Sequence, residues 1–346
     1  MRVPKKKKRA LKIALSIVLP ILFVISAMVY LFTPRPYYIE QPGVTLPLSK
    51  MVTVAGKNAE NKGNFYLTAV TVRPANNALL LTSHFNDFAS VVPAKEMTGG
   101  LNDKQFNLVN QYYMETAQNT AVYQAFKSAG KPYTINYQGV YVLQVTDNST
   151  FKKDLQIADT VTAVNGQSFK ASKDMINYVA GQKIGDTVTI EVTRIDGSKH
   201  SFSGHYIKLS NGKTGIGIGL TDHTSVETDP EVKIDAGAIG GPSAGMMFTL
   251  EIYDQLTGAK LLQGRSIAGT GTIEEDGTVG QIGGVDKKVA SASQNKASVF
   301  LVPDSGTKNA STNNYLGALT AAKKLKTSMK IVPVKTVQDA LDYLKK

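Results

Sequence analysis

Ser243 stands in the stretch Ala238–Gly245, where glycine, proline and alanine surround a single hydroxyl side chain. Pro242 can open a helix, because its missing N–H would be unpaired in the first turn anyway. An apolar run from Met246 to Leu250 follows at once. The free N–H groups and the dipole of a helix N-terminus favour negative charge, which suits a hydroxyl nucleophile and its oxyanion. A glycine-rich turn with a serine N-cap explains the same letters, so the octapeptide alone leaves both interpretations open.

The segments after Ser243 predict an α/β arrangement that would position it. Apolar side chains at 246, 250, 253 and 256 recur at steps of three and four, which predicts an amphipathic helix that ends at Gly258. Helices and strands then alternate along the chain, and the ranges are a helix over 287–295, a strand over 298–302, a helix over 318–325, a strand over 331–334 and a helix over 337–344. This alternation is typical of a sheet covered by helices.

Four pieces of this region resemble the proteolytic domain of the Lon proteases. They are Gly241–Gly245, Thr270–Ile273, Gly283–Lys288 and Val332–Leu341, and they keep the family's order over residues 215–344. The resemblance implies that Ser243 is the catalytic serine and that Lys288 stands at the position of the catalytic lysine. It also places Thr270 where a family threonine hydrogen-bonds this lysine.

The same resemblance assigns the oxyanion and substrate loop to Gly241, Pro242 and Ala244. Asp286 and Lys287 replace the Lys-Glu pair of the family motif, so Lys287 is a minor rival for the base. A serine hydroxyl needs a base, and an exposed lysine with a pKa near 10.4 is charged. Burial lowers the pKa of a lysine toward ~7–8, where it can accept a proton.

A Ser–His arrangement is the alternative to a lysine base. The chain has four histidines. Two, His200 and His205, lie in a region that reads as a separate module, His223 follows a turn, and His84 sits in Thr-Ser-His-Phe. None has a context like that of the family, and we therefore favour lysine.

Residues 133–209 predict a β-rich module. The expected elements are strands at 139–145 and 160–164, an Asn-Gly turn at 165–166, a helix over 172–180 and closing strands at 187–194 and 198–207. Their order, and the phrase Ile157–Gly166, resemble a PDZ domain of the bacterial protease-associated type. The resemblance implies that a peptide adds to a sheet edge beside a carboxylate-binding loop. We assign that loop to Gln138, Gly139, Val140 and Tyr141.

The N-terminus predicts a membrane anchor. Residues 1–12 contain seven basic side chains and no acidic one, and twenty uncharged residues follow from Ile13 to Phe32. A run of this length spans a ~30 Å hydrocarbon core, and the basic flank predicts a cytoplasmic N-terminus. A cleaved signal peptide is the rival interpretation, but its apolar region would be shorter. We expect a flank at 1–12, an anchor at 13–33 and an extracellular part from residue 34.

The composition and charge distribution argue against several classes of function. The chain has 346 residues, no cysteine and a formal charge of +12, of which the first twelve residues carry seven. This distribution, without basic-aromatic interleaving, argues against nucleic-acid binding. Lys213-Thr214 does not complete a nucleotide-binding loop, because the glycine required five residues before Gly212 is Ile207. We expect no cofactor and no metal.

Anchor, PDZ-like module and Lon-like domain together resemble the SepM-type group of membrane-anchored, pheromone-processing serine proteases. We expect an α+β fold, in which residues 34–132 form the first extracellular part of the protease, 133–209 an inserted or preceding PDZ-like domain, and 210–346 the proteolytic domain. The expected function is an ATP-independent serine endopeptidase that acts outside the cytoplasm on peptides such as secreted signalling peptides. Its partners would be a peptide or protein substrate and membrane lipid, and a homo-oligomer stays open. The alternative is a non-catalytic PDZ scaffold with a degenerate protease domain.

Overall fold

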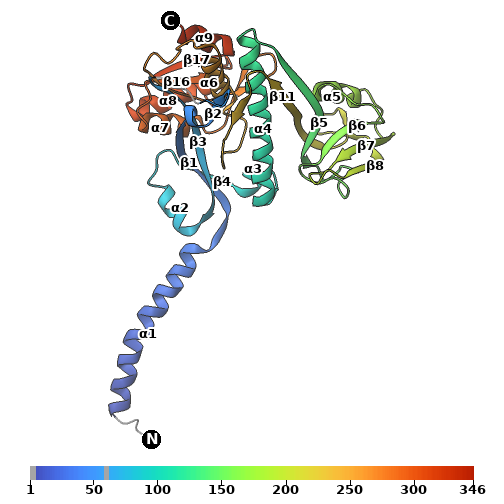
Figure 1. Ribbon diagram of the computed structural model, residues 1–346. Helices are drawn as coiled ribbons and strands as arrows, with labels where there is room; N and C mark the ends of the chain where they lie inside the picture. Colours follow the sequence, from blue (N-terminus) through green and yellow to red (C-terminus); the bar gives the residue numbers. More distant parts are fainter. Residues whose placement is uncertain (1–4, 58–61) are drawn as a thin grey trace. The chain divides into compact units, whose positions relative to one another are not determined.

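The computed structural model describes residues 5–57 and 62–346, and for residues 5–15 it describes the helical backbone alone (Figure 1). The chain divides into two compact units. One consists of residues 1–42 and 70–100, and the other of residues 43–69 and 101–346. Ser243, Thr270 and Lys288 all belong to the second unit.

The first unit begins with the long helix α1 (Lys5–Phe32), which contains Pro20. Its other elements are most of β1 (Pro34–Pro47), the end of β3 (Asn64–Asn76), α2 (Asn77–Ser83), β4 (Ser90–Pro93) and α3 (Ala94–Thr98). β1 and β4 pair antiparallel from Tyr37 opposite Pro93 to Glu40 opposite Ser90.

The predicted membrane anchor falls on α1. The predicted basic flank at 1–12, and residues 13–15 of the anchor, lie outside the residues whose side chains are described. Within the described part of the chain, no helix combines the length and the hydropathy that a bilayer crossing requires.

The largest sheet of the chain supports the candidate site. Its strand order is β17 (Lys330–Val334), β16 (Val299–Pro303), β13 (Ser266–Gly269), β3, β1 and β4. β13 is parallel to both β16 and β3, with Ala268 opposite Phe300 on one side and Tyr66 on the other. β16 is buried along its whole length, as expected of a strand covered on both faces.

Five helices of the described second unit belong to this part of the fold, and of these α8 and α9 contact β17 while α4 packs against α6. They are α4 (Asp103–Ser128), α6 (Gly245–Thr257), α7 (Val285–Gln294), α8 (Asn314–Leu325) and α9 (Val337–Leu344). α6 is buried on every side from Gly245 to Asp254, and it contributes Met246, Met247 and Phe248 to the main core. α4 is one continuous helix, which starts at a capping box formed by Asn102 and Gln105.

Short elements complete the second unit. They are the 3₁₀ helix η1 (Leu48–Lys50) and three strand pairs: β2 (Val52–Val54) with β12 (Val232–Ile234), β9 (Ile207–Lys208) with β10 (Thr214–Gly215), and β14 (Thr272–Ile273) with β15 (Val279–Gly280). β14 begins two residues after Thr270.

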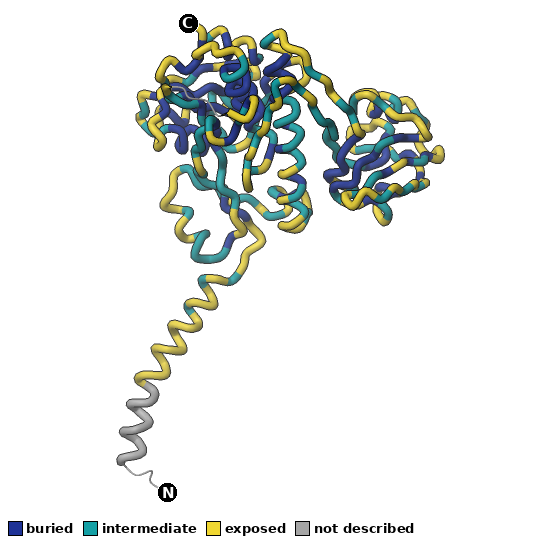
Figure 2. The backbone as a smooth tube through the Cα atoms, viewed as in Figure 1, coloured by how far each residue is buried: buried dark blue, intermediate teal, exposed yellow. Residues whose placement is uncertain are grey.

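A five-stranded antiparallel sheet forms the predicted β-rich module. Its order is β11 (Ile218–Thr228), β5 (Tyr133–Val145), β6 (Thr160–Val164), β7 (Thr187–Thr193) and β8 (Lys199–His205), and α5 (Ser172–Ala180) belongs to the same module. Its separate core includes Val140, Val188 and Ile190, and the inner strands are dark blue in Figure 2. β11, which lies within the range 210–346 that we expected to form the proteolytic domain, pairs with β5 from Ile218 opposite Val145 to Thr228 opposite Tyr133. The sheet therefore continues well past residue 209.

Candidate active site

Ser243 lies in a turn before α6, so the helix begins later than it would if Pro242 opened it. α6 begins at Gly245, and Ala244 occupies the N-cap position. The reason lies in the carbonyl oxygen of Ser243, which accepts the Gly271 N–H at 2.9 Å and the Thr270 hydroxyl at 3.1 Å. These two bonds hold the serine backbone against the chain that follows β13.

Lys288 approaches Ser243 from α7. This helix begins after Gly284, whose φ of 65° is left-handed and therefore suits glycine. Lys288 is 3% exposed, and its Nζ atom donates to the Ser243 hydroxyl oxygen at 3.0 Å and to the Thr68 carbonyl oxygen at 2.6 Å. Both of these acceptors are neutral oxygens, so the amine is held in place without a carboxylate at either contact.

Thr68 is a member of this constellation that the sequence did not reveal. It lies on β3, is 3% exposed, and donates its own hydroxyl to the Gly269 carbonyl at 3.1 Å across the parallel pair β3–β13. Its contribution toward Lys288 is a backbone carbonyl, which every residue type carries. No residue letter could have indicated it, because only the strand pairing decides which carbonyl faces α7.

Thr270 supports the serine rather than the lysine. It is 1% exposed, and its hydroxyl donates to the Ser243 carbonyl instead of forming the expected bond with Lys288. A buried hydroxyl that donates to a backbone carbonyl fixes that segment of chain. Thr270 therefore positions Ser243.

The backbone N–H groups of the predicted oxyanion loop differ in whether they already donate a hydrogen bond. Gly241 has a left-handed φ of 87° and donates its N–H to the Asn110 carbonyl at 2.7 Å, and Pro242 has no N–H. In the described part of the chain, the N–H groups of Ser243 and Ala244 donate no hydrogen bond. These two groups, just before α6, are the ones that could receive an oxyanion.

The rival bases have other partners. Lys287 Nζ lies 3.2 Å from the Asp286 carboxylate oxygens. Nδ1 of His84 lies 2.7 Å from the Leu80 carbonyl. His223 Nδ1 lies 2.9 Å from the Thr160 hydroxyl, the ring stacks on Tyr141, and burial lowers the pKa of His223. Each of these three side chains thus has a partner other than Ser243.

The residues of the predicted peptide-binding loop lie in a strand of the five-stranded sheet. Gln138, Gly139, Val140 and Tyr141 lie inside β5, which pairs with β11 on one side and with β6 on the other. Val140 and Tyr141 pair with both neighbouring strands, and Gly139 lies opposite His223 of β11. Gly139 has a φ of 143°, and a Cβ there would lie 2.2 Å from the Val161 carbonyl oxygen. This glycine permits the close approach of two strands.

The structure instead provides a groove between α5 and β11, the last strand on that side of the sheet. It encloses 190 Å³ and is lined by Met175, Ile176, Val179, Leu209, Thr214, Gly215, Ile216, Gly217, Ile218 and Leu220. The sequence carries a signal for this groove, because glycine and apolar residues alternate at 215–220. An apolar groove beside a sheet edge can accept an added peptide strand.

Two protein families match the chain. Residues 111–203 match the PDZ domain, and residues 172–345 match the Lon protease (S16) C-terminal proteolytic domain. The chain therefore combines a PDZ domain with a Lon-type proteolytic domain in a mixed α/β fold.

Individual proteins that are similar to the chain include Lon proteases and a solved PDZ domain. The chain is 28% identical to a Lon protease of Neorickettsia sennetsu over 36% of its own length and 14% of that protein. It is 27% identical to a Lon protease of Ureaplasma parvum over 62% of its length and 27% of that protein. The chain thus spans about a quarter or less of these relatives. A PDZ domain of an SdrC-like protein from Listeria monocytogenes is 31% identical, with 25% of this chain and 93% of that domain covered and a TM-score of 0.24.

Proposed function

The chain belongs to the family of the Lon protease (S16) C-terminal proteolytic domain, and on that basis we propose that it is a serine endopeptidase with Ser243 as nucleophile and Lys288 as base. The observation that carries this proposal is the 3.0 Å contact between Lys288 Nζ and Ser243 Oγ. Nucleophile and base must lie within hydrogen-bond reach, and this pair does. Thr270 is a positioning residue in the same proposal.

The first step needs a neutral lysine. Lys288 is 3% exposed, and a surrounding of low polarity favours the uncharged form of an amine. The Thr68 carbonyl can hold one N–H of that amine, so that its lone pair faces the Ser243 hydroxyl. Lys288 then takes the hydroxyl proton as Oγ attacks the peptide carbonyl carbon, and the carbonyl oxygen becomes an oxyanion.

The oxyanion would bind the N–H groups of Ser243 and Ala244, where the N-terminus of α6 also favours negative charge. Protonated Lys288 next gives its proton to the leaving amine, and an acyl-enzyme remains. A water molecule then attacks the carbonyl carbon of the acyl-enzyme while Lys288 takes a proton from it. Protonated Lys288 returns this proton to Ser243 Oγ, and the acid product leaves.

We propose that the groove between α5 and β11 holds a part of the substrate away from Ser243. Its apolar lining suits an extended segment with apolar side chains. We also propose that cleavage needs no nucleotide, because the sequence lacks a phosphate-binding loop. Secreted signalling peptides remain the substrate class that we propose.

We propose further that residues 13–33 anchor the chain and that residues 34–346 act outside the cytoplasm. The support is the uncharged run from Ile13 to Phe32 with its basic N-terminal flank. A protease added to intact cells should then degrade residues 34–346. Protection of these residues in intact cells, with degradation after lysis, would contradict this orientation.

The proposed activity is tested with the full-length chain in detergent, incubated with short secreted peptides without nucleotide. We expect endoproteolysis that Ser243→Ala abolishes. If the wild-type chain binds such peptides but cleaves none, the scaffold alternative is correct. If Ser243→Ala cleaves as well as the wild type, the assignment of the nucleophile is wrong.

A further inference from the structure

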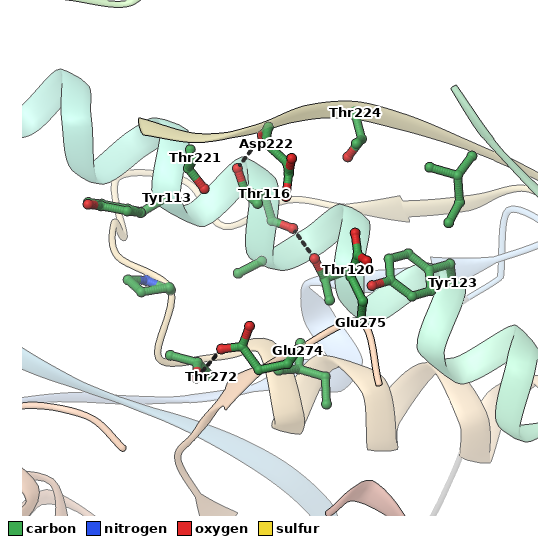
Figure 3. Close-up of a pocket in the computed structure, with 14 residues that line it drawn as sticks. Tyr113, Thr116, Thr120, Tyr123, Thr221, Asp222, Thr224, Thr272, Glu274 and Glu275 are labelled. Atoms are coloured by element: carbon green, nitrogen blue, oxygen red, sulfur yellow. Dashed lines mark hydrogen bonds between the residues drawn. The ribbon is translucent and has the colours of Figure 1, made fainter. Parts of the chain in front are cut away.

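A second cavity lies beside the candidate active site, between α4, β11 and the turn after β14 (Figure 3). It encloses 250 Å³. Pockets for drug-sized ligands measure roughly 300–1,000 Å³, so this smaller cavity suits a group such as one large side chain. Pro242, the residue before Ser243, forms part of the wall. A group bound here would therefore belong to a molecule that also reaches the nucleophile.

The wall of this cavity is rich in negative charge. Asp222 comes from β11, and Glu274 and Glu275 follow β14. Asp222 accepts the Ser172 N–H at 3.0 Å, and Glu274 accepts the Thr272 hydroxyl at 3.4 Å. Among the described residues, the Glu275 carboxylate has no hydrogen bond or ion pair.

The carboxylates also repel one another. Partial burial raises the pKa of Glu275, and the charges of Asp222, Glu274 and Asp174 raise it further, against a smaller opposite effect of Lys127. The Lys127 ammonium donates instead to the Glu275 backbone carbonyl, at 3.3 Å. A cation placed between these groups would relieve their repulsion.

A second feature is independent of the charges. The Tyr123 side chain is 5% exposed, and its hydroxyl oxygen is buried without a hydrogen-bond partner in the described part of the chain. In Figure 3 this hydroxyl points into the cavity, on the side of Thr120 and Glu275. A buried hydroxyl without a partner is costly, so its presence here points to a ligand that supplies one.

The arrangement of the side chains favours a guanidinium over a metal ion as the bound cation. In the described part of the chain, no three His, Cys, Asp or Glu side chains lie close enough to hold a metal ion. A guanidinium presents five N–H donors in a fixed plane, which can reach separate carboxylate and hydroxyl oxygens at once. An arginine side chain thus satisfies the carboxylates and Tyr123 together.

We propose that this cavity is a substrate pocket that accepts an arginine side chain near the bond to be cleaved. The proposal rests on the proposed function, because it names the substrate class of the same site. Asp222, Glu274 and Glu275 would attract the guanidinium, and the Tyr123 hydroxyl would accept one of its N–H groups.

Binding is measured with the full-length chain carrying Ser243→Ala, so that the result does not depend on cleavage. The probes are fluorescent peptides that differ at a single position, which holds arginine or its neutral isostere citrulline, moved along the sequence. We expect the arginine peptide to bind about tenfold more tightly than the citrulline peptide at one position, as a charged hydrogen bond allows.

Glu275→Gln should remove most of this preference, whereas Glu191→Gln, an exposed carboxylate on β7, should retain it. Tyr123→Phe should weaken the arginine peptide without lowering the Tm, because the lost hydroxyl has no partner in the free chain. Equal binding at every position, no binding of any peptide, or a preference that survives Glu275→Gln would overturn the proposal. If the preference holds but the wild-type chain cleaves no peptide, the pocket stands and the proposed endopeptidase activity fails.

Discussion

Lys288 Nζ and Ser243 Oγ lie 3.0 Å apart although 45 residues separate them in the chain. Hydrogen bonds to other parts of the chain fix both residues in this position. The Thr68 carbonyl holds the amine at 2.6 Å, and the Gly271 N–H and Thr270 hydroxyl hold the serine backbone. The geometry of the pair therefore depends on β3, β13 and the turn before α6 together.

The first prediction concerns the base. Lys288→Arg keeps the positive charge, but a guanidinium stays protonated and cannot take a proton from Ser243. We expect kcat/KM to fall at least about 10³-fold, as when other catalytic groups are removed. Lys287→Arg should have a mild effect, because that side chain contacts Asp286 instead.

Ser243→Ala should lower kcat/KM as much as Lys288→Arg does. The double variant should have a kcat/KM little lower than that of either single variant, because the effects of residues in one catalytic unit are not additive. Steady-state cleavage of a fluorogenic peptide measures all four variants. Activity that is lost with Lys287→Arg and kept with Lys288→Arg would place the base one residue earlier. If both variants keep their activity, the lysine base is wrong and His84 is the next candidate to test.

The second prediction concerns Thr270. Thr270→Val removes the hydroxyl that donates to the Ser243 carbonyl and keeps the volume of the buried side chain. We expect kcat to fall roughly tenfold or more with little change in KM, because a small displacement of the nucleophile affects the reacting geometry. Thr270→Ser retains the donor and should recover most of the kcat. If Val and Ser behave alike, the methyl group matters and the hydrogen bond does not.

The sequence predicted the nature of the proteolytic domain because its motifs are carried by side chains. Ser243, Thr270 and Lys288 each stand in a recognisable piece of sequence, and Gly258 ends α6 in a left-handed conformation as predicted. The Thr68 carbonyl and the unpaired N–H groups of Ser243 and Ala244 belong to the backbone. Their positions follow from the pairing of strands and from turn geometry, which no single sequence states.

The peptide-binding region of the PDZ domain shows the limit of pattern reading. Gly139 was assigned to a binding loop from the resemblance to a PDZ domain, but here it permits the close approach of β6. The glycines at 215, 217 and 219 alternate like a strand, and β11 does begin at Ile218. Whether such a strand ends up at an edge of the sheet depends on the order of all five strands.

The third prediction tests the groove between α5 and β11. Ile176 lines it and is 47% exposed, and Ile184, outside it, is equally exposed. Ile176→Glu should weaken a peptide with apolar side chains about tenfold, since it loses apolar contact and places a carboxylate in an apolar groove. Ile184→Glu is the matched control and should bind like the wild type. Fluorescence anisotropy measures both, and equal loss in the two variants would show that the groove is not the site.

The last prediction concerns pH and the buried carboxyl of Glu251. This residue is 1% exposed on α6, burial raises its pKa from 4.5 to about 7, and the neighbouring Asp254 acts in the same direction. Gln255 donates to it at 2.7 Å and has the opposite effect. Between pH 4.5 and pH 7 the folded chain therefore holds a proton at Glu251 that the unfolded chain has lost. Because the unfolded state binds fewer protons in this window, the contribution of Glu251 to stability falls as pH rises, and the loss is complete above pH 7.

Glu251→Gln keeps an acceptor for Gln255 and removes the ionisation. We expect its free energy of unfolding to exceed that of the wild type by on the order of 1–3 kcal/mol at pH 8, and to match it at pH 4.5 and below. Thermal unfolding of both chains across this range measures the difference, with exposed Glu191→Gln as the control that should show no such trend. A Glu251→Gln chain that is less stable than the wild type at pH 8 would mean that its surroundings stabilise the ionised carboxylate, which contradicts a raised pKa of Glu251.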